Sequence, residues 1–329
     1  MLNHPSALAR LLAAVTGATL ALAIAAPVQA FLRDVRLLQP NVVSHNGRPL
    51  LLTCPQPQGL IGMGANVNVV AATGGIGLDK AWITAGRSDQ AELGAINTDG
   101  SRGQWGISGQ IVCASYTDTP PTSTTGGPYL KDVVVTRRES DRSSSTRRVV
   151  SVDCGGRKAI GGGYSLLAIR PGSRTQTAPP SRVVADIAKI VPPNGFTVAA
   201  HETQAIPTTW WVESYAICAN YTDFIAGPIY VGPGPLVYTS TTPAGSVDRN
   251  TAVGCPPGWF LLAGGARVTG AAVNQAPPPQ VVLRSSQPTI VFASGRANAW
   301  LANAAEERAT SASWRLQTTA MCAPFVFPS

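Results

Sequence analysis

Residues 210–219 read Trp-Trp-Val-Glu-Ser-Tyr-Ala-Ile-Cys-Ala, and the same frame occurs three times along the chain. Each copy has a tryptophan eight positions before a cysteine that alanine follows, at 105–114, 210–219 and 314–323. In the middle copy, strand periodicity places Trp211, Glu213 and Tyr215 on one face and the cysteine on the other. The frame therefore predicts a β-strand that recurs in three copies.

A further cysteine lies upstream of each of these strands. The chain has six cysteines, namely Cys54, Cys113, Cys154, Cys218, Cys255 and Cys322. Both the first and the second cysteine of a copy recur after about 100 residues. Self-similarity at a fixed period indicates a repeat architecture. We place the three copies at 31–125, 126–226 and 227–329.

The even number of cysteines predicts disulfides, because three equivalent copies favour one bond within each. This scheme pairs Cys54 with Cys113, Cys154 with Cys218, and Cys255 with Cys322. A cyclic scheme that joins the second cysteine of one copy to the first of the next is the alternative. The sequence has no Cys-x-x-Cys pair, so we expect neither a zinc site nor any other metal or cofactor.

The segments around the cysteines favour strands. Short runs rich in β-branched residues, such as 148–152 and 196–200, lie between turn residues. Residues 298–308 contain good helix formers, but they align with the run at 196–200, so we expect a strand or a short helical turn. The sequence therefore predicts an all-β protein of three homologous, disulfide-closed β units. They are packed together, either around a pseudo-threefold axis or as tandem sandwiches.

Glycine recurs shortly after each first cysteine, most densely at Gly161-Gly-Gly163. Glycine within a strand usually marks a bulge or the close approach of another backbone. We expect such an approach here, and one form of it is an aromatic ring, such as that of the recurring tryptophan, lying on the bare backbone. The alternative is a phosphate-binding loop, which is disfavoured because no Lys-Ser or Lys-Thr follows.

The first 30 residues read as a secretory signal peptide. Arg10 is their only charged residue, 11–26 is an apolar run, and Val28-Gln-Ala30 has small residues at the positions that a signal peptidase reads. A membrane anchor is the alternative, but the run is short for a bilayer. We expect cleavage near Ala30 and no transmembrane segment afterwards. The protein would then be secreted, extracellular or periplasmic, and its arginine-rich composition suggests a bacterial source.

Basic and aromatic residues provide the candidate ligand site. The chain has a net charge of +8, and residues 137–148 contain five arginines. Tryptophans outside the repeated frame can stack on a sugar ring if they are exposed. The candidate binding residues are Trp82, Trp211, Trp300, Arg137, Arg138, Arg142, Arg147 and Arg148. The alternatives are core packing for the tryptophans and a solvated hairpin loop for the arginines.

These residues favour a secreted, non-enzymatic binding or structural protein. Its expected ligand is a glycan or an anionic cell-envelope polymer, and three equivalent units suit multivalent attachment. Nucleic acid is a poor candidate because no recognised motif accompanies the arginines. A purely structural or inhibitory extracellular protein is a further alternative.

Candidate catalytic residues are sparse. Beyond the first 30 residues only His45 and His201 remain, and no Gly-x-Ser-x-Gly motif is present. The alternative function is a secreted hydrolase that uses His201 with a nearby acid such as Glu202. The acidic residues that recur between copies fit turn or cap positions better than an active site, and they are Asp34 with Asp132 and Asp118 with Asp223.

The combined pattern resembles modules of secreted bacterial proteins of unassigned function. It is carried by Cys255-Pro-Pro-Gly258, Gly161-Gly-Gly163 and Ala216-Ile-Cys-Ala219. The resemblance covers most of the chain after residue 30 and implies no particular activity. A fainter likeness links the chain to threefold β-prism proteins, whose repeats also place a cysteine before a glycine-containing strand. Their repeats are about half as long.

Overall fold

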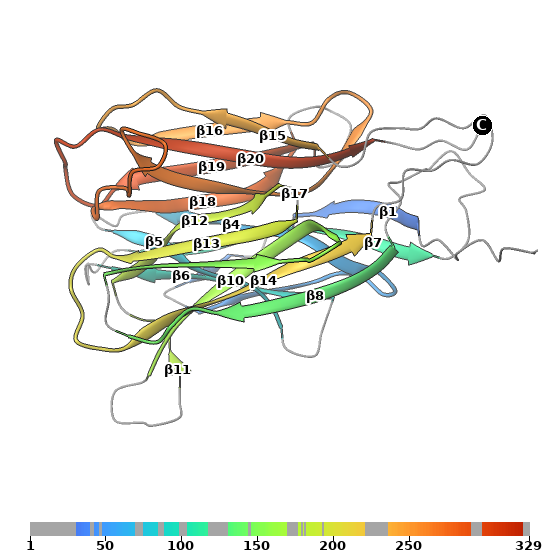
Figure 1. The fold of residues 1–329 in the computed structure, drawn as a ribbon, viewed down its shortest axis with the longest axis horizontal. Helices are drawn as coiled ribbons and strands as arrows, with labels where there is room; N and C mark the ends of the chain where they lie inside the picture. The colour runs from blue at the N-terminus through green and yellow to red at the C-terminus, as the bar shows by residue number, and fades with distance from the viewer. Residues whose placement is uncertain are drawn as a thin grey trace, which may run out of the picture.

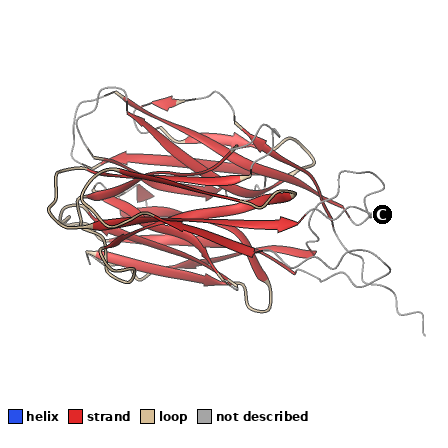
Figure 2. Ribbon diagram, turned by 90° about the horizontal axis from the view of Figure 1, so that it is seen from above, coloured by secondary structure: helices blue, strands red, loops and turns tan. Residues whose placement is uncertain are grey.

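The computed structural model describes residues 31–39, 43–45, 48–69, 75–84, 89–98, 104–117, 131–143, 146–169, 177–178, 180, 182–192, 194–220, 236–290 and 298–324. Every regular element in these ranges is a β-strand, which confirms the predicted all-β class (Figure 2). The predicted signal peptide lies outside the described residues.

The strands of the three copies follow one another along the chain, from copy 1 to copy 3 (Figure 1). Copy 1 contains β1 (Phe31–Leu38), β2 (Ser44–His45), β3 (Leu50–Thr53), β4 (Gly59–Val69), β5 (Ile76–Ile83), β6 (Gln90–Asn97) and β7 (Trp105–Thr117). Copy 2 contains β8 (Lys131–Glu139), β9 (Arg147–Asp153), β10 (Lys158–Ile169), β11 (Thr177–Ala178), β12 (Val183–Val191), β13 (Gly195–Glu202) and β14 (Trp210–Asn220). Copy 3 contains β15 (Leu236–Thr241), β16 (Arg249–Gly254), β17 (Trp259–Gly270), β18 (Val281–Thr289), β19 (Ala299–Glu306) and β20 (Trp314–Pro324).

Each copy divides its strands between two sheets. Sheet A has the order β1-β7-β4-β18-β19-β16, sheet B has β3-β6-β5-β10-β14-β8, and sheet C has β15-β20-β17-β12-β13-β9. Sheet A therefore combines strands of copies 1 and 3. Sheet B combines strands of copies 1 and 2, and sheet C combines strands of copies 2 and 3. This exchange closes a ring of three copies. It decides between the two predicted arrangements, because tandem sandwiches would not share sheets.

The two halves of every sheet meet at a short seam. Only two residue pairs join β4 to β18 at seam A, β10 to β5 at seam B, and β12 to β17 at seam C. At seam B these pairs are Tyr164 with Ala81 and Ser165 with Lys80. The neighbouring strands β4, β10 and β17 also contact one another, as do β5, β12 and β18. The seams therefore surround the centre of the ring.

The recurring glycines make the seams possible. A Cβ atom added to Gly64, Gly163 or Gly265 would overlap a backbone carbonyl of the strand across the seam. A bulge precedes the glycines in β4, β10 and β17 alike. Both predicted roles, the bulge and the close backbone approach, are thus present. The predicted contact between a recurring tryptophan and the glycine backbone is not the one observed at Gly264. There, the ring of Trp300 lies against the glycine.

One disulfide closes each copy and connects its two sheets. The bonds are Cys54–Cys113, Cys154–Cys218 and Cys255–Cys322, and no cysteine is free. This is the predicted scheme, and the cyclic alternative is excluded. Such bonds are stable in oxidising surroundings, so they indicate that the chain folds in an oxidising, extracytoplasmic type of environment.

The recurring tryptophans are buried between the two half-sheets of a copy. Trp210 donates its indole N–H to Glu202 Oε1 at 2.8 Å, and Arg148 lies 5.1 Å from the ring centroid. In copy 3, Trp314 donates to Glu306 at 2.8 Å and Arg249 lies over its ring. The run at 298–308, with its helix-forming composition, is the strand β19, which supplies Glu306. Packing against Trp314 overrides the local propensity.

Candidate functional site

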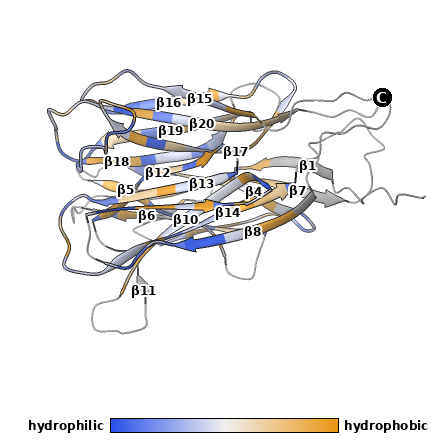
Figure 3. Ribbon diagram, in the orientation of Figure 1, coloured by the Kyte–Doolittle hydropathy of each residue, from blue (hydrophilic) through white to orange (hydrophobic). Residues whose placement is uncertain are grey.

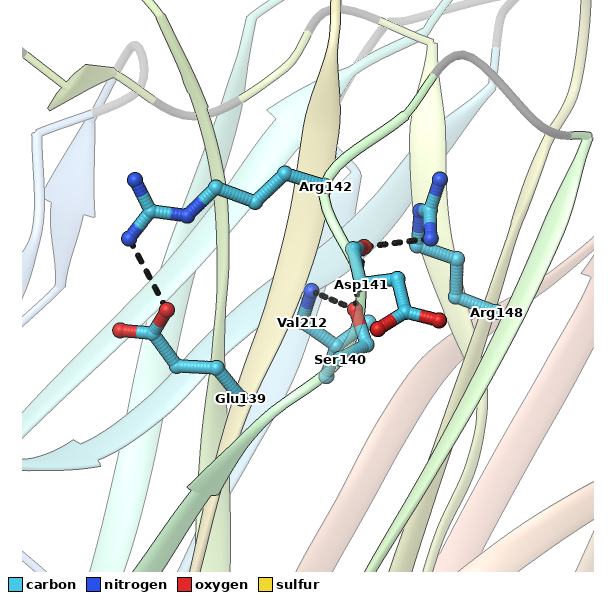
Figure 4. A network of polar contacts seen from close by, with 6 residues as sticks. All are labelled: Glu139, Ser140, Asp141, Arg142, Arg148 and Val212. Carbon is cyan, nitrogen blue, oxygen red and sulfur yellow. Dashed lines mark hydrogen bonds and ion pairs between the residues drawn. The ribbon is translucent and has the colours of Figure 1, made fainter.

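The basic run of the sequence spans the end of β8, the start of β9 and the loop between them, and because β8 lies in sheet B and β9 in sheet C the two strands do not form the predicted hairpin. Its polar network is shown in Figure 4. Ser140 and Val212 exchange two hydrogen bonds, from Ser140 N to the Val212 carbonyl at 2.8 Å and from Val212 N to Ser140 Oγ at 3.0 Å. Arg148 donates to the Asp141 carbonyl. This loop is therefore fastened to β14, which carries Trp211, and the end of β8 that enters the loop is hydrophilic (Figure 3).

Trp211 lies beneath this loop, on the outer face of sheet B. The Arg142 guanidinium covers its ring at 4.3 Å from the centroid and also bonds Glu139 at 2.9 Å. The side chains of Arg142 and Glu139 are 53% and 45% exposed, whereas Trp211 is only 2% exposed. The Trp211 indole N–H has no hydrogen-bond partner. An exposed arginine, paired with an exposed glutamate, thus covers an aromatic ring with an unused donor.

Trp82 lies on the same outer face, across seam B. Arg137 lies 5.1 Å from its ring centroid, and Tyr215 meets it edge-on at 5.0 Å. Tyr215 and Arg137 are paired across β14 and β8, so their side chains share a face. Two tryptophans from different copies, each with an arginine over its ring, therefore lie on one face, and Tyr215 contacts Trp82.

Glu213 stands between the two aromatic groups, two residues from Trp211 and two from Tyr215. Its pKa is raised because it is partly buried and because Glu139 lies opposite it in the ladder, while Arg137 and Arg142 act against this shift. The pKa of Glu213 therefore depends on how close Arg137 and Arg142 lie to its carboxylate.

We call this surface the Trp–Arg face. It consists of Trp82, Arg137, Glu139, Arg142, Trp211, Glu213 and Tyr215. Aromatic rings can stack on a sugar ring, guanidinium groups can bind its carboxylate, and the glutamates can accept hydrogen bonds from its hydroxyl groups. It brings together four of the eight predicted ligand residues, from two copies that are distant in sequence.

The other four predicted ligand residues lie elsewhere. Trp300 is in the interior and donates its indole N–H to Ser286 at 3.0 Å. Arg148 faces Trp210, Arg138 donates to the Ser151 carbonyl at 3.3 Å, and Arg147 pairs with Asp186 on sheet C. Trp300 and Arg148 therefore pack the interior.

Among the described residues, Trp259 is the one partly exposed tryptophan, and the other six are buried. The rings of the predicted ligand residues Trp82, Trp211 and Trp300 are therefore covered in this conformation. Trp82 and Trp211 differ from Trp300 because side chains at the surface, rather than the interior, cover their rings.

The residues of the predicted hydrolase alternative point to opposite faces of β13. His201 Nδ1 lies 3.7 Å from Asp186 Oδ1, and its Nε2 lies 3.3 Å from the Pro279 carbonyl. Glu202 instead accepts from the Trp210 indole and, at 3.4 Å, from the Ile206 backbone N–H. The 3.7 Å distance between His201 Nδ1 and Asp186 Oδ1 is too long for a hydrogen bond.

Several other sequence candidates fall outside the description. Asp118 and Asp223 lie outside the described residues, and the side chains of Asp34, His45 and Asp132 are likewise not described. Within the described ranges, no three or more His, Cys, Asp or Glu side chains form a group that could hold a metal ion. Those same ranges contain no helix long and apolar enough to span a membrane.

Two repeated positions were missing from the sequence analysis. Arginine stands six residues before the first cysteine in every copy, as Arg48, Arg148 and Arg249. Glutamate stands eight residues before the recurring tryptophan in two copies, as Glu202 and Glu306. Extending the repeat alignment outward would have marked Glu202 as a partner of tryptophan rather than as a catalytic acid.

Comparison with known proteins adds no relative. No model of a protein family matches the chain, and no curated protein matches it either.

Proposed function

We propose that this protein is exported and binds an acidic glycan of the cell envelope through the Trp–Arg face, without catalysing a reaction. The observation that carries the proposal is the asymmetry of this face in a threefold repeat. The position of Trp211 is held by Gly106 in copy 1 and by Arg315 in copy 3. The fold does not require a tryptophan there, so another role must account for it.

Opening of the face requires little free energy. An exposed ion pair such as Arg142–Glu139 contributes about 0–1 kcal/mol. An acidic sugar can therefore replace Glu139 at the guanidinium of Arg142, with its apolar face on the Trp211 ring. The unused indole N–H then donates to a sugar oxygen, which removes an unsatisfied buried donor.

Export is supported by the sequence of residues 1–30 together with the three disulfides. A bacterial secretory route with cleavage near Ala30 remains our expectation. The Trp–Arg face is formed once, by copies 1 and 2. We therefore propose a single binding face of this kind in place of three equivalent ones.

The hydrolase alternative gains no support from the geometry. Both oxygens of Glu202 accept hydrogen bonds from the protein, and His201 is buried against Pro279. General acid–base catalysis needs such groups within reach of a substrate.

The test is a titration of the full chain with an oligomer of galacturonic acid and, in parallel, with a neutral oligomer of glucose. We expect the acidic oligomer to bind more tightly, and Arg142→Gln to weaken this binding about ten-fold, since a charge-assisted hydrogen bond is lost. Exposed Arg308 provides the control, because Arg308→Gln changes the net charge equally. Equal affinity in wild type and Arg142→Gln would contradict the proposal.

A further inference from the structure

Seam C carries a second surface feature that the Trp–Arg face does not include. Arg267 on β17 pairs with Ile187 of β12 across the seam and with Gln317 of β20 on its other side. Lys189 is two residues beyond Ile187, so its side chain lies on the same face. Lys189 Nζ donates to Gln317 Oε1 at 2.8 Å. Arg267 and Lys189 therefore converge on one glutamine.

A third cation adjoins them. Arg147 donates to Asp186 Oδ2 from two nitrogens, at 2.9 and 3.3 Å. Asp186 is fully buried. Burial alone would raise its pKa, but His201 and Arg147 together hold the pKa below its usual value. The carboxylate of Asp186 is thus already engaged by Arg147.

Neither Arg267 nor Lys189 forms an ion pair among the described residues, although the buried Asp186 attracts Arg267 from a distance. The Nε atom of Arg267 is buried and has no hydrogen-bond partner. Burial and then the nearby Arg147 lower the pKa of Arg267, Asp186 acts against this shift, and burial and then Arg267 lower the pKa of Lys189. Two partly buried cations that repel each other destabilise the fold unless an anion joins them.

The fold itself does not need these charges. The positions of Arg267, Lys189 and Gln317 are occupied at seam B by Ser165, Trp82 and Glu213, and at seam A by Asn66, Gln287 and Ser108. All three seams nevertheless form the same two residue pairs. The cations at seam C are therefore an addition to the common architecture.

We propose that seam C binds a tetrahedral oxyanion, a phosphate or sulfate group, between Arg267 and Lys189. Arg147 adds to the positive potential, and Gln317 holds Lys189 in place. A guanidinium and an ammonium that converge from neighbouring strands match the several acceptor oxygens of such a group. The group comes from a free ion or from a phosphorylated polymer. This site is distinct from the Trp–Arg face and stands without the proposed glycan binding.

The test is a thermal unfolding series of the full chain in sodium phosphate and in sodium chloride of equal ionic strength, at neutral pH. A ligand that binds only the native state raises the unfolding temperature in a saturable way. We expect phosphate to do so and Arg267→Gln or Lys189→Gln to weaken the apparent affinity about ten-fold or more. Arg308→Gln is the control of equal charge and should respond as wild type does.

Two further readouts keep the outcome decisive. Without phosphate, Arg267→Gln should unfold at the wild-type temperature or above it, since a repulsion is removed, and this excludes misfolding as the cause. A poly(glycerol phosphate) chain that binds more tightly than phosphate would identify a polymer as the source of the group. The proposal is overturned if phosphate stabilises wild type no more than chloride does, or stabilises wild type and Arg267→Gln equally. Loss of Arg142 should leave this binding unchanged.

Discussion

Residues in the interior of the copies make recurring contacts, whereas residues on the outer faces of the seams differ from copy to copy. Inside, the same contacts recur, as in the pairs Trp210–Glu202 and Trp314–Glu306. Outside, equivalent positions carry different chemistry, with Arg267 at seam C, Ser165 at seam B and Asn66 at seam A. Residues that repeat are those which the fold requires. The residues that break the repeat are consequently the first candidates for function.

The bulge positions of the seams show the same contrast within one structural site. Asp79 in β5, Asp186 in β12 and Arg284 in β18 are the extra residues of equivalent bulges. Asp186 is paired with Arg147, whereas Asp79 Oδ1 has no hydrogen-bond partner. Burial raises the pKa of Asp79 from 3.8 to about 6, although Lys80 acts against the shift. At equivalent bulge positions, the pKa of Asp79 is therefore raised and the pKa of Asp186 is lowered.

The largest effect tests whether the interiors are equivalent. Replacing both cysteines of one copy by alanine should lower the free energy of unfolding by about 4 kcal/mol, by the chain-entropy estimate for loops of this length. The Cys154–Cys218 and Cys255–Cys322 pairs should give similar losses, because they close loops of 64 and 67 residues. Urea unfolding measures both. A large difference between them would show that the copies are not energetically alike.

The two bulge aspartates should respond with opposite signs. Asp79→Asn should raise the free energy of unfolding at neutral pH by up to about 3 kcal/mol, because it removes a buried charge that Lys80 compensates only in part. Asp186→Asn should lower it by about 3 kcal/mol, because Arg147 loses its partner. Unfolding of the two variants at neutral pH measures this, and shifts of the same sign would contradict the contrast.

The pH dependence follows from the same shifts. Asp79 binds its proton more tightly in the folded state, so its contribution to stability falls as pH rises from about 4 to about 6. Asp186 has a lowered pKa, so its contribution is present above about pH 4 and is lost as the pH falls below its folded-state pKa. Asp79→Asn should abolish the first trend and leave the second intact.

A smaller effect tests the seam itself. Gly163→Ala should lower the free energy of unfolding by about 2 kcal/mol, since its Cβ would overlap the Ala81 carbonyl. Gly156→Ala is a matched control, because a Cβ there meets nothing within 4 Å. Chemical unfolding should place the control near wild type. A wild-type value for Gly163→Ala would mean that the strands do not approach closely at seam B.

The smallest stability effect concerns the partners of the recurring tryptophans. Glu202→Ala and Glu306→Ala should each lower the free energy of unfolding by about 1 kcal/mol or somewhat more, because each leaves a buried indole N–H unsatisfied. The shift in urea midpoint should be the same for both within error. If Glu202→Ala alone were neutral, Glu202 would not share the structural role of Glu306.

The repeated cysteines, tryptophans and glycines were enough to predict the all-β class and the disulfide pairing. They could not reveal the exchange of half-sheets, because a strand such as β5 carries no local sign that its partner is β10 of another copy. The ligand site itself stays a prediction. The sequence named Trp211 and Arg142 together, as the structure places them, but it could not show that Trp300 and Arg148 lie in the interior, because burial depends on the facing sheet. Lys189 and Arg267 become neighbours only through the exchange.

Nuclear magnetic resonance of the indole N–H groups tests the central claim most directly, since the chain has seven tryptophans and seven such signals. During titration with the acidic oligomer, the Trp211 signal should move most, because that N–H has no partner in the free protein. Those of Trp210 and Trp314, bonded to glutamates inside their copies, should stay in place. A fixed Trp211 signal, or equal movement of Trp210 and Trp314, would contradict the account.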